Sequence, residues 1–448
     1  MTNRRADHDV VVVGAGPAGL AVAHLLERSG RSVVVLEAGL ANDGQALQSA
    51  NLFAARDEPS AWRTDVSVRH TSAQNWIPYR QGKGFGGAGA INAMVCMPGD
   101  EWEDPADREA ARRLMTNTYT YHPGERRLGS SIVDTWRSRF STPDPIDGDC
   151  AEAPSLWAED PATFTRRRFE TPKQLILSTA VEDIIPGPTT MLHTSSGTMS
   201  ARTVVVCAGA IQTARLVAGF APPGTVGRAV QDHPAVRLAI RLNQGARMTD
   251  LSAPVVSGTA RWRSRPESPS PDLHMLVLDA IGTVASDGDH GVVMVALMQP
   301  NSRGTLTFQR DGTALLDLHM LADQRDLERL RAGLRRIIEL VSSDDLQHVI
   351  DAVFVDDKGT PLSSADYLCT DDLLTDEWLR QTAGDYSHVV GSCPAGLAAH
   401  SGRQLGLVFG TDNVWIADAS LFTSIPAANT MIPTMVIAES VGRRIAAR

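Results

Sequence analysis

The chain has 448 residues, which is long enough to bury a large hydrophobic core and to form two or three domains. Hydrophobic residues make up 43% and charged residues 21%, and the formal net charge is −10, a balance that argues against a nucleic-acid-binding or anionic-membrane-binding surface. No apolar run reaches the roughly 18 residues that a membrane-spanning helix needs, and the first eight residues lead into a strand rather than a signal-peptide core. We therefore expect a soluble, cytoplasmic protein with no membrane span and no nucleic-acid partner.

The cysteines agree with a reducing compartment. They are odd in number, scattered and without C-x-x-C spacing, so free thiols are expected at Cys96, Cys150, Cys207, Cys369 and Cys393. No metal site is expected.

The first patterned stretch, residues 9–39, reads DVVVVGAGPAGLAVAHLLERSGRSVVVLEAG and predicts a βαβ unit. Residues 10–13 are a short β-branched run typical of a buried parallel strand. Residues 18–28 predict a helix, and residues 32–36 predict a second buried strand.

Three glycines between the first strand and the helix point to a bound dinucleotide. Gly14 permits the tight turn, Gly16 lets the backbone approach a pyrophosphate, and Gly19 lets helix and strand pack closely, in the G-x-G-x-x-G spacing. Glu37, at the end of the second strand, is expected to accept hydrogen bonds from a ribose, which favours FAD or NAD over NADP. The alternative is an ordinary βαβ unit with incidental glycines.

A second glycine-rich stretch, residues 80–99, reads RQGKGFGGAGAINAMVCMPG. So many glycines are costly in chain entropy, and we expect them to let the backbone pack against a flat ligand or a phosphate where a Cβ atom would clash. A flexible surface loop is the alternative, but the apolar continuation argues against it. Residues 40–75, which precede this stretch, show no clear period and are expected to form surface loops and short helices.

Residues 82–94, GKGFGGAGAINAM, resemble the second flavin-contacting motif of the glucose–methanol–choline (GMC) oxidoreductases, a family of FAD-dependent alcohol dehydrogenases and oxidases. Further stretches resemble the family in the same order along the chain, at residues 201–217, 230–234, 300–308, 387–396 and 414–440. Several matches in the same order are stronger evidence for the family than any single match, and together they extend over nearly the whole chain.

The resemblance implies a non-covalently bound FAD. Ala88 and Gly89 replace the hydroxyl pair that is usual in the family, which leaves more of the phosphate binding to backbone amides. Ile91 stands where members with covalently bound flavin carry His, and a hydrocarbon side chain cannot form that bond. The implied cofactor-binding residues are Gly14, Gly16, Pro17, Ala18, Gly19, Glu37, Ala38, Gly84, Gly86, Gly87, Gly89, Asn92, Ala93, Met94, Val181, Ala208, Gly209, Asp418, Ala419, Asn429 and Thr430.

The rest of the chain predicts further strands and a long helix. Strands are expected within residues 174–185 and, as two more, within residues 197–210, which lead into a helix at residues 211–220. Residues 323–342 predict an amphipathic helix. Strand-like runs that we assign to an antiparallel sheet occupy residues 236–242, 274–281, 292–298 and 304–308.

These elements predict an α/β fold class, with a Rossmann-like FAD-binding domain and an α+β substrate domain that contains the antiparallel sheet. The FAD-binding domain is expected to be discontinuous, and the substrate or cap domain is expected to fill the gaps between its parts. The expected boundaries are 1–100, 171–235 and 385–448 for the FAD-binding domain, and 101–170 and 236–384 for the substrate domain.

The resemblance places the catalytic pair at His388 and Asn429. Imidazole suits removal of a hydroxyl proton because its unperturbed pKa is about 6.5, and an amide N–H can hold the substrate oxygen. The alternatives are a structural histidine and, for Asn429, a helix cap. We interpret His233 as structural, because it lies where the chain leaves the FAD-binding domain, and His274 and His319 as histidines within strands.

The sequence therefore predicts FAD-dependent oxidation of an alcohol to a carbonyl, with His388 as general base. The substrate is expected to be a small polar alcohol, sugar-like or natural-product-like, and the acidic net charge nudges the expectation toward polar or cationic molecules. Oxygen or another acceptor would reoxidise the flavin. The alternatives are a lyase that uses the same scaffold with a structural FAD, a flavin-dependent monooxygenase, for which no second dinucleotide motif is seen, and a non-catalytic FAD-binding protein.

Overall fold

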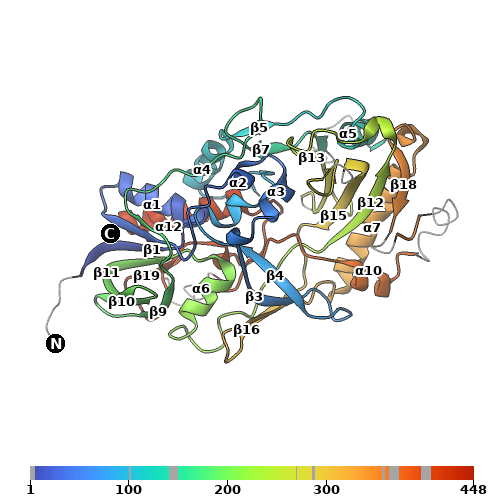
Figure 1. Cartoon of the computed structure of the whole chain (residues 1–448). Helices are drawn as coiled ribbons and strands as arrows, with labels where there is room; N and C mark the ends of the chain where they lie inside the picture. Colours follow the sequence, from blue (N-terminus) through green and yellow to red (C-terminus); the bar gives the residue numbers. More distant parts are fainter. Residues whose placement is uncertain are drawn as a thin grey trace.

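The first strand of the chain lies inside a seven-stranded sheet at one end of the molecule (Figure 1). The computed structural model describes residues 6–99, 102–140, 150–268, 270–284, 288–355, 359–362, 373–394 and 405–448. The strands follow the order β8 (Leu175–Ile176), β2 (Val33–Leu36), β1 (His8–Val13), β11 (Gly197–Val206), β10 (Thr190–Thr194) and β9 (Val181–Ile185), and β19 (Val414–Ile416) also pairs with β11.

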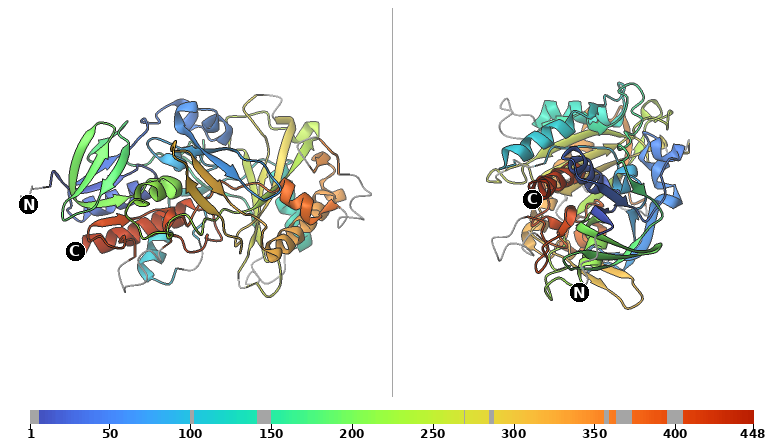
Figure 2. Two further views of the ribbon diagram at one scale, coloured as in Figure 1. Left: turned by 90° about the horizontal axis from the view of Figure 1, so that it is seen from below. Right: turned by 90° about the vertical axis from the view of Figure 1, so that its left-hand side faces the viewer.

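The central strands of this sheet are parallel and buried. β1 pairs in parallel with β2 and β11, and β11 pairs in parallel with β19. The valines of β1 and β2 are almost fully buried, as expected for a parallel sheet covered on both faces. Helix α1 (Pro17–Arg28) joins β1 to β2 and packs against the C-terminal helix α12 (Met431–Ala446), which brings the two ends of the chain side by side (Figure 2). The predicted βαβ unit is confirmed.

A six-stranded antiparallel sheet lies at the opposite end of the molecule (Figures 1 and 2). Its order is β18 (Ile350–Phe354), β12 (Ala235–Leu242), β15 (His290–Leu297), β14 (Leu273–Leu278), β13 (Val256–Trp262) and β6 (Cys150–Glu152). Helices α5 (Leu128–Phe140) and α7 (Gln324–Val341) pack on one face of it. The leucines and isoleucines predicted for one face of α7 are buried. The predicted α/β fold class with a sheet-rich second part is confirmed.

A four-stranded sheet lies between the other two (Figure 1). Strands β3 (Trp62–Arg69) and β4 (Ile77–Gly82) pair with β17 (Ala314–Asp317) and, through it, with β16 (Thr305–Phe308). β17 runs parallel to β3, so segments about 250 residues apart in the sequence share this sheet. The other strands and α-helices in the described residues are β5 (Thr118–Thr120), β7 (Ser155–Trp157), α2 (Gln45–Gln48), α3 (Leu52–Arg56), α4 (Pro105–Met115), α6 (Gly209–Val217) and α10 (Asp376–Thr382).

Several local predictions differ from the structure. Residues 197–206 form one ten-residue strand rather than two, and the strand predicted within residues 304–308 lies in the four-stranded sheet as β16 rather than in the six-stranded antiparallel sheet. Residues 40–75 contain the strand β3, because its alternating buried valines find a partner in β17 only in the folded chain. His319 lies in a turn with φ +46° and not in a strand.

Cys96, Cys150, Cys207 and Cys393 are free thiols, as predicted, and Cys369 lies outside the described residues. Among the helices that the structure describes, none is long and apolar enough to cross a membrane.

Candidate active site

The first glycine turn is shaped by two close backbone contacts and one open position. Gly14 has φ +104°, and a Cβ atom on it would lie 2.4 Å from the carbonyl oxygen of Cys207. A Cβ on Gly19 would lie 1.9 Å from the carbonyl oxygen of Gly14. A Cβ on Gly16, at the N-terminus of α1, would have no neighbour within 4 Å. The turn therefore leaves free space at the end of the helix that attracts phosphate.

Glu37 connects the glycine turn to the second glycine-rich segment. Its Oε2 accepts a hydrogen bond from the backbone N–H of Ala15 at 2.9 Å, and its Oε1 accepts from Gly39 at 2.8 Å and Gly84 at 3.0 Å. Oε2 retains one acceptor position, since a carboxylate oxygen has two lone pairs. The expected ribose contact is compatible with this arrangement, and the side chain has an additional structural role.

The second glycine-rich segment packs directly on the first turn. The N–H of Gly86 donates to the carbonyl oxygen of Ala15 at 2.8 Å, and a Cβ on Gly87 would lie 3.0 Å from the Cα of Gly16. Gly84, Gly86 and Gly87 all have positive φ, which other residues adopt only with strain. The segment is therefore an ordered wall of backbone, and the flexible-loop alternative is not what the structure shows.

A buried arginine that sequence reasoning missed holds the end of this wall. Arg166 is 3% exposed, and its guanidinium donates to Asn92 Oδ1 at 2.7 Å, to the Asn92 carbonyl at 2.7 Å and to the Gly89 carbonyl at 3.3 Å. Its Nε has no hydrogen-bond partner in the ranges that the structure describes, and burial lowers the pKa of the guanidinium to about 10. Within the described part of the chain, no carboxylate forms an ion pair with it.

The other predicted cofactor-binding residues gather around the same end of the parallel sheet. Asp418 accepts hydrogen bonds from the Gly209 N–H at 2.8 Å and the Thr213 hydroxyl at 2.5 Å, which ties the start of α6 to the turn after β19. Val181 opens β9, and Thr179 just before it donates to the Glu37 carbonyl at 2.8 Å.

The start of α12 also meets the second glycine-rich segment. The Asn92 amide donates to the sulfur of Met431 at 3.3 Å, next to Thr430, the residue at the N-cap of α12. Thr430 makes no side-chain cap bond there. Asn429 is not the cap of this helix, so the capping alternative does not explain it.

The loop that carries His388 lies against the antiparallel sheet. Gly384 exchanges two backbone hydrogen bonds with Ala235 of β12, at 2.8 and 2.9 Å. Asp232 then holds the loop, because its carboxylate accepts the backbone N–H groups of His388 at 2.9 Å, His233 at 2.7 Å and Tyr386 at 3.3 Å. These contacts fix the backbone of the loop at His388 relative to the antiparallel sheet.

Three rings form a stacked column at this loop. Tyr386 stacks on His388 with centroids 4.6 Å apart and on His274 of β14 with centroids 6.1 Å apart. The Tyr386 hydroxyl lies 3.3 Å from His274 Nδ1, and it also shares a hydrogen bond with the side chain of Asn429. Asn429 Oδ1 is buried and has no hydrogen-bond partner among the described residues. We call His274, Tyr386 and His388 the ring column.

His233 determines which nitrogen of His388 carries a proton. His233 Nε2 lies 3.0 Å from the carbonyl oxygen of Pro426, which can only accept, so Nε2 is protonated. Burial lowers the pKa of His233 to about 4, so the ring is neutral and its Nδ1 is an acceptor. His388 Nδ1 lies 3.0 Å away and must donate to it. The lone pair of His388 is therefore on Nε2.

Both histidines of the ring column are neutral near pH 7. Burial lowers the pKa of His388 well below its usual value, and the neighbouring His233 and His274 rings lower it further. Burial and then the nearby Arg261 lower the pKa of His274 to about 3. A neutral imidazole with a free lone pair can accept a proton at once. His233, interpreted from sequence as structural, and Tyr386 were not predicted as parts of this site.

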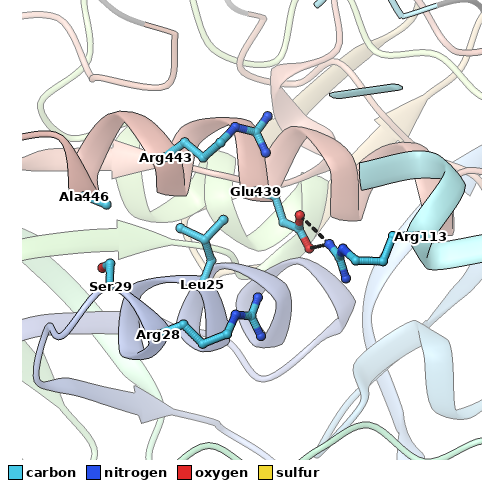
Figure 3. A pocket seen from close by; sticks show the side chains of 7 residues that line it. All are labelled: Leu25, Arg28, Ser29, Arg113, Glu439, Arg443 and Ala446. Carbon is cyan, nitrogen blue, oxygen red and sulfur yellow. Dashed lines mark hydrogen bonds and ion pairs between the residues drawn. The ribbon is translucent and has the colours of Figure 1, made fainter. Parts of the chain in front are cut away.

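A separate hollow of about 600 Å³ lies between α1, α4 and α12 (Figure 3). Leu25 and Arg28 of α1 point into it, and Arg113 of α4 donates to both carboxylate oxygens of Glu439, at 2.5 and 2.6 Å. None of its lining residues belongs to the glycine segments or the ring column. The chemistry of the ring column therefore does not extend into this hollow.

Comparison with known proteins agrees with this geometry. Residues 9–253 match the family described as FAD dependent oxidoreductase, which is more than half of the chain. Residues 300–438 match the family described as GMC oxidoreductase. These matches make the chain an FAD-dependent oxidoreductase. Within that class, the chain belongs to the GMC oxidoreductases, as its motifs indicated.

Two curated relatives and one solved structure illustrate the likeness. The 5-(hydroxymethyl)furfural oxidase of Methylovorus sp. (strain MP688) is 28% identical over 55% of this chain, which spans 51% of that protein. The oxygen-dependent choline dehydrogenase of Pseudomonas fluorescens is 24% identical over 99% of this chain and 94% of that protein. The pyridoxine 4-oxidase from Mesorbium loti has a TM-score of 0.79 at 17% identity, covers 99% of this chain and 100% of its own, and shares the fold.

FAD is the cofactor of this family, and the residues present fit it. The open position at Gly16 and the glycine wall leave room for a pyrophosphate beside the N-terminus of α1. Ile91 packs in an apolar cluster with Leu47, Ala55 and Ala61, which offers no nucleophile to a flavin ring.

Proposed function

We propose that this enzyme oxidises a small-molecule alcohol to a carbonyl compound, with His388 as the general base and Asn429 as the group that holds the substrate oxygen. One observation carries the proposal. The hydrogen bonds from His388 to His233 and from His233 to Pro426 leave the His388 Nε2 lone pair free, beside a tyrosine that contacts Asn429.

In this proposal His388 Nε2 removes the hydroxyl proton of the substrate. The Asn429 amide nitrogen has two N–H donors, of which the Tyr386 hydroxyl takes one, so the other can donate to the substrate oxygen and orient the alcohol for reaction. Bound FAD supplies the acceptor for the hydride that leaves the substrate carbon. Tyr386 limits the motion of the His388 ring by stacking on it.

The proposal extends to the cofactor and the domains. The FAD is bound non-covalently by the predicted residues of the two glycine segments, of Val181, of residues 208–209 and 418–419, and of residues 429–430. The seven-stranded sheet supports the proposed FAD-binding parts 1–100, 171–235 and 385–448, and the six-stranded sheet supports the substrate parts 101–170 and 236–384, while the four-stranded sheet joins strands of both. The free cysteines favour a cytoplasmic enzyme. Oxygen or another acceptor reoxidises the flavin.

Anaerobic mixing of the FAD-loaded protein with a panel of alcohols tests the proposal. We expect the yellow flavin absorbance to bleach with a substrate alcohol, and we expect His388→Gln and Asn429→Ala to slow the bleaching. His193, an exposed histidine of β10, provides a matched control in His193→Gln. A lyase would convert its substrate while the flavin stays yellow, and that result would refute the proposal.

A further inference from the structure

One face of the antiparallel sheet turns toward the ring column. Leu273 and Val295 lie under Gly333 of α7, so their face of the sheet packs on that helix. Because side chains alternate along a strand, His274 points to the opposite face, where Tyr386 stacks on it. Residues paired with His274 across the strands therefore point to the same face, and so do residues two positions before or after them on their own strand. This face meets the active site.

Two arginines lie on this face, next to the ring column. Arg261 of β13 is paired directly with His274 across the strands. Arg237 of β12 lies two residues from Ala235, which is in register with Ala296 and, through it, with His274. The Arg237 guanidinium also donates to the backbone carbonyl of Asp385, one residue before Tyr386, at 2.6 Å.

The charges of these two arginines are not neutralised by ion pairs with other described residues. Within that part of the chain, no carboxylate oxygen lies within 4 Å of the nitrogens of Arg237 or Arg261, and the partner of Arg237 is a neutral carbonyl. The Asp385 carboxylate, whose charge acts on Arg237, is hydrogen-bonded to the His70 ring at 2.6 Å and to the backbone N–H of Ser387 at 2.8 Å, and Glu152 lies on the strand next to Arg261. The cations on this face remain available to a ligand.

Further arginines strengthen the positive charge beside Arg237. Burial lowers the pKa of Arg56 at the end of α3, and the positive charge of Arg237 lowers it further; Asp385 opposes this, Arg80 adds to it, and Asp57 has the smallest, opposing effect. Three elements, α3, β4 and β12, thus bring like charges together at this end of the site. Positive charges held close together repel one another, and a bound anion would replace this repulsion with attraction.

We propose that the alcohol oxidised at the ring column carries an anionic group, a carboxylate or a phosphate, that Arg237 and Arg261 bind. A guanidinium binds either group through two parallel N–H donors, which orients the substrate as well as attracting it. This inference rests on the proposed alcohol oxidation. It reverses the expectation from the net charge of −10, because the charges that face the site differ from the average over the chain.

A matched series of substrates tests the proposal with the FAD-loaded enzyme. The series comprises benzyl alcohol, 4-(hydroxymethyl)benzoate, 4-(hydroxymethyl)phenyl phosphate and 4-(aminomethyl)benzyl alcohol, and the measured quantity is kcat/KM for flavin reduction. We expect at least one anionic alcohol to exceed the neutral one by about tenfold and the cationic alcohol to be the poorest. The carboxylate and phosphate arms show which anion is preferred. The advantage should shrink with added salt.

Variants of the two arginines test whether these side chains cause the preference for anionic substrates. We expect Arg237→Met and Arg261→Met to lower the ratio of anionic to neutral kcat/KM by about tenfold. Arg241→Met is the matched control, because Arg241 lies on the same strand and face but pairs with Asp351 and packs on Phe354, and it should leave the ratio unchanged. Binding of 4-methylbenzoate against 4-methylbenzamide, followed by flavin absorbance, gives the same comparison without turnover.

The outcomes separate this inference from the proposed function. If the neutral alcohol is oxidised and neither anion is preferred, the anionic-substrate proposal is wrong while alcohol oxidation stands. If Arg241→Met lowers the ratio as much as Arg237→Met, the recognition is not by these two arginines and the proposal is also wrong. If no alcohol of any charge bleaches the flavin, alcohol oxidation itself is refuted.

Discussion

Replacing His233 tests how the structure prepares His388 for proton removal. In His233→Leu, the Nδ1–H of His388 loses its acceptor at 3.0 Å, and the Pro426 carbonyl loses its donor at the same distance. An unsatisfied buried polar group costs about 1 to 3 kcal/mol. If the reactive orientation and tautomer of His388 depend on this bond, flavin reduction should slow by about 5- to 150-fold.

Stopped-flow measurement of anaerobic flavin reduction is the assay, with His233→Gln as the conservative variant. The glutamine amide offers an oxygen to His388 and an N–H to Pro426, so we expect it to recover most of the rate. Burial lowers the His388 pKa, and the positive charge of His233, once that ring is protonated near pH 4, lowers it further, so removing His233 should raise the His388 pKa. Because the base must be neutral, the acid side of the rate profile should shift to higher pH in His233→Leu.

A purely structural His233 would give a different result. Unfolding of the protein without FAD reports the loss of stability by itself, and a structural role would change only this quantity. If His233→Leu reduces the flavin at the wild-type rate with an unchanged pH profile, the reasoning about the tautomer of His388 is wrong.

Three further predictions follow from the cofactor segments and the buried histidine. Gly16→Ala should leave the stability of the protein without FAD unchanged, because the new Cβ meets only open space, and should weaken FAD binding, because that space is where the pyrophosphate is expected. The control Gly44→Ala, at the open N-cap of α2, should change neither quantity. Equal FAD dissociation constants for the two variants would contradict the prediction. Arg166→Met should lower the unfolding free energy by about 1 to 3 kcal/mol, because the partly buried Asn92 carbonyl loses its donor and Asn92 Oδ1 keeps only the Met94 N–H. Arg168→Met, at an exposed position nearby, should have a much smaller effect in the same denaturant titration. His233 takes up a proton near pH 6.5 in the unfolded chain but only near pH 4 in the folded protein, where it is buried. Its contribution to the unfolding free energy is therefore complete above pH 6.5 and falls by up to about 3 kcal/mol toward pH 4. The stability of wild type should fall more steeply than that of His233→Gln over this pH range, and parallel stability curves would contradict the prediction.

Local patterns in the sequence were sufficient for the parts of the protein that depend on neighbouring residues. The strand, glycine turn and helix of residues 9–39 were predicted and confirmed, because buried valines, a positive-φ glycine and a helical period are properties of short segments. The amphipathic helix predicted at residues 323–342 is observed as α7 (Gln324–Val341) for the same reason. The motifs of the second glycine segment and of the C-terminal part also indicated the family, because they too are runs of adjacent residues.

Only the tertiary structure decided which side chains act together. His233 and His388 are 155 residues apart, so no local pattern predicted their contact or the position of the free lone pair. Arg166 meets Asn92 across 74 residues, and Arg261 meets His274 through strand register. Burial, which sets the pKa of His233, and the local excess of arginines beside a net negative chain both depend on how distant segments pack. The sequence by itself determined the cofactor turn and the family. The fold determined the protonation and the charge of the site, because both depend on all the groups that lie near a residue in space, whatever their distance along the chain.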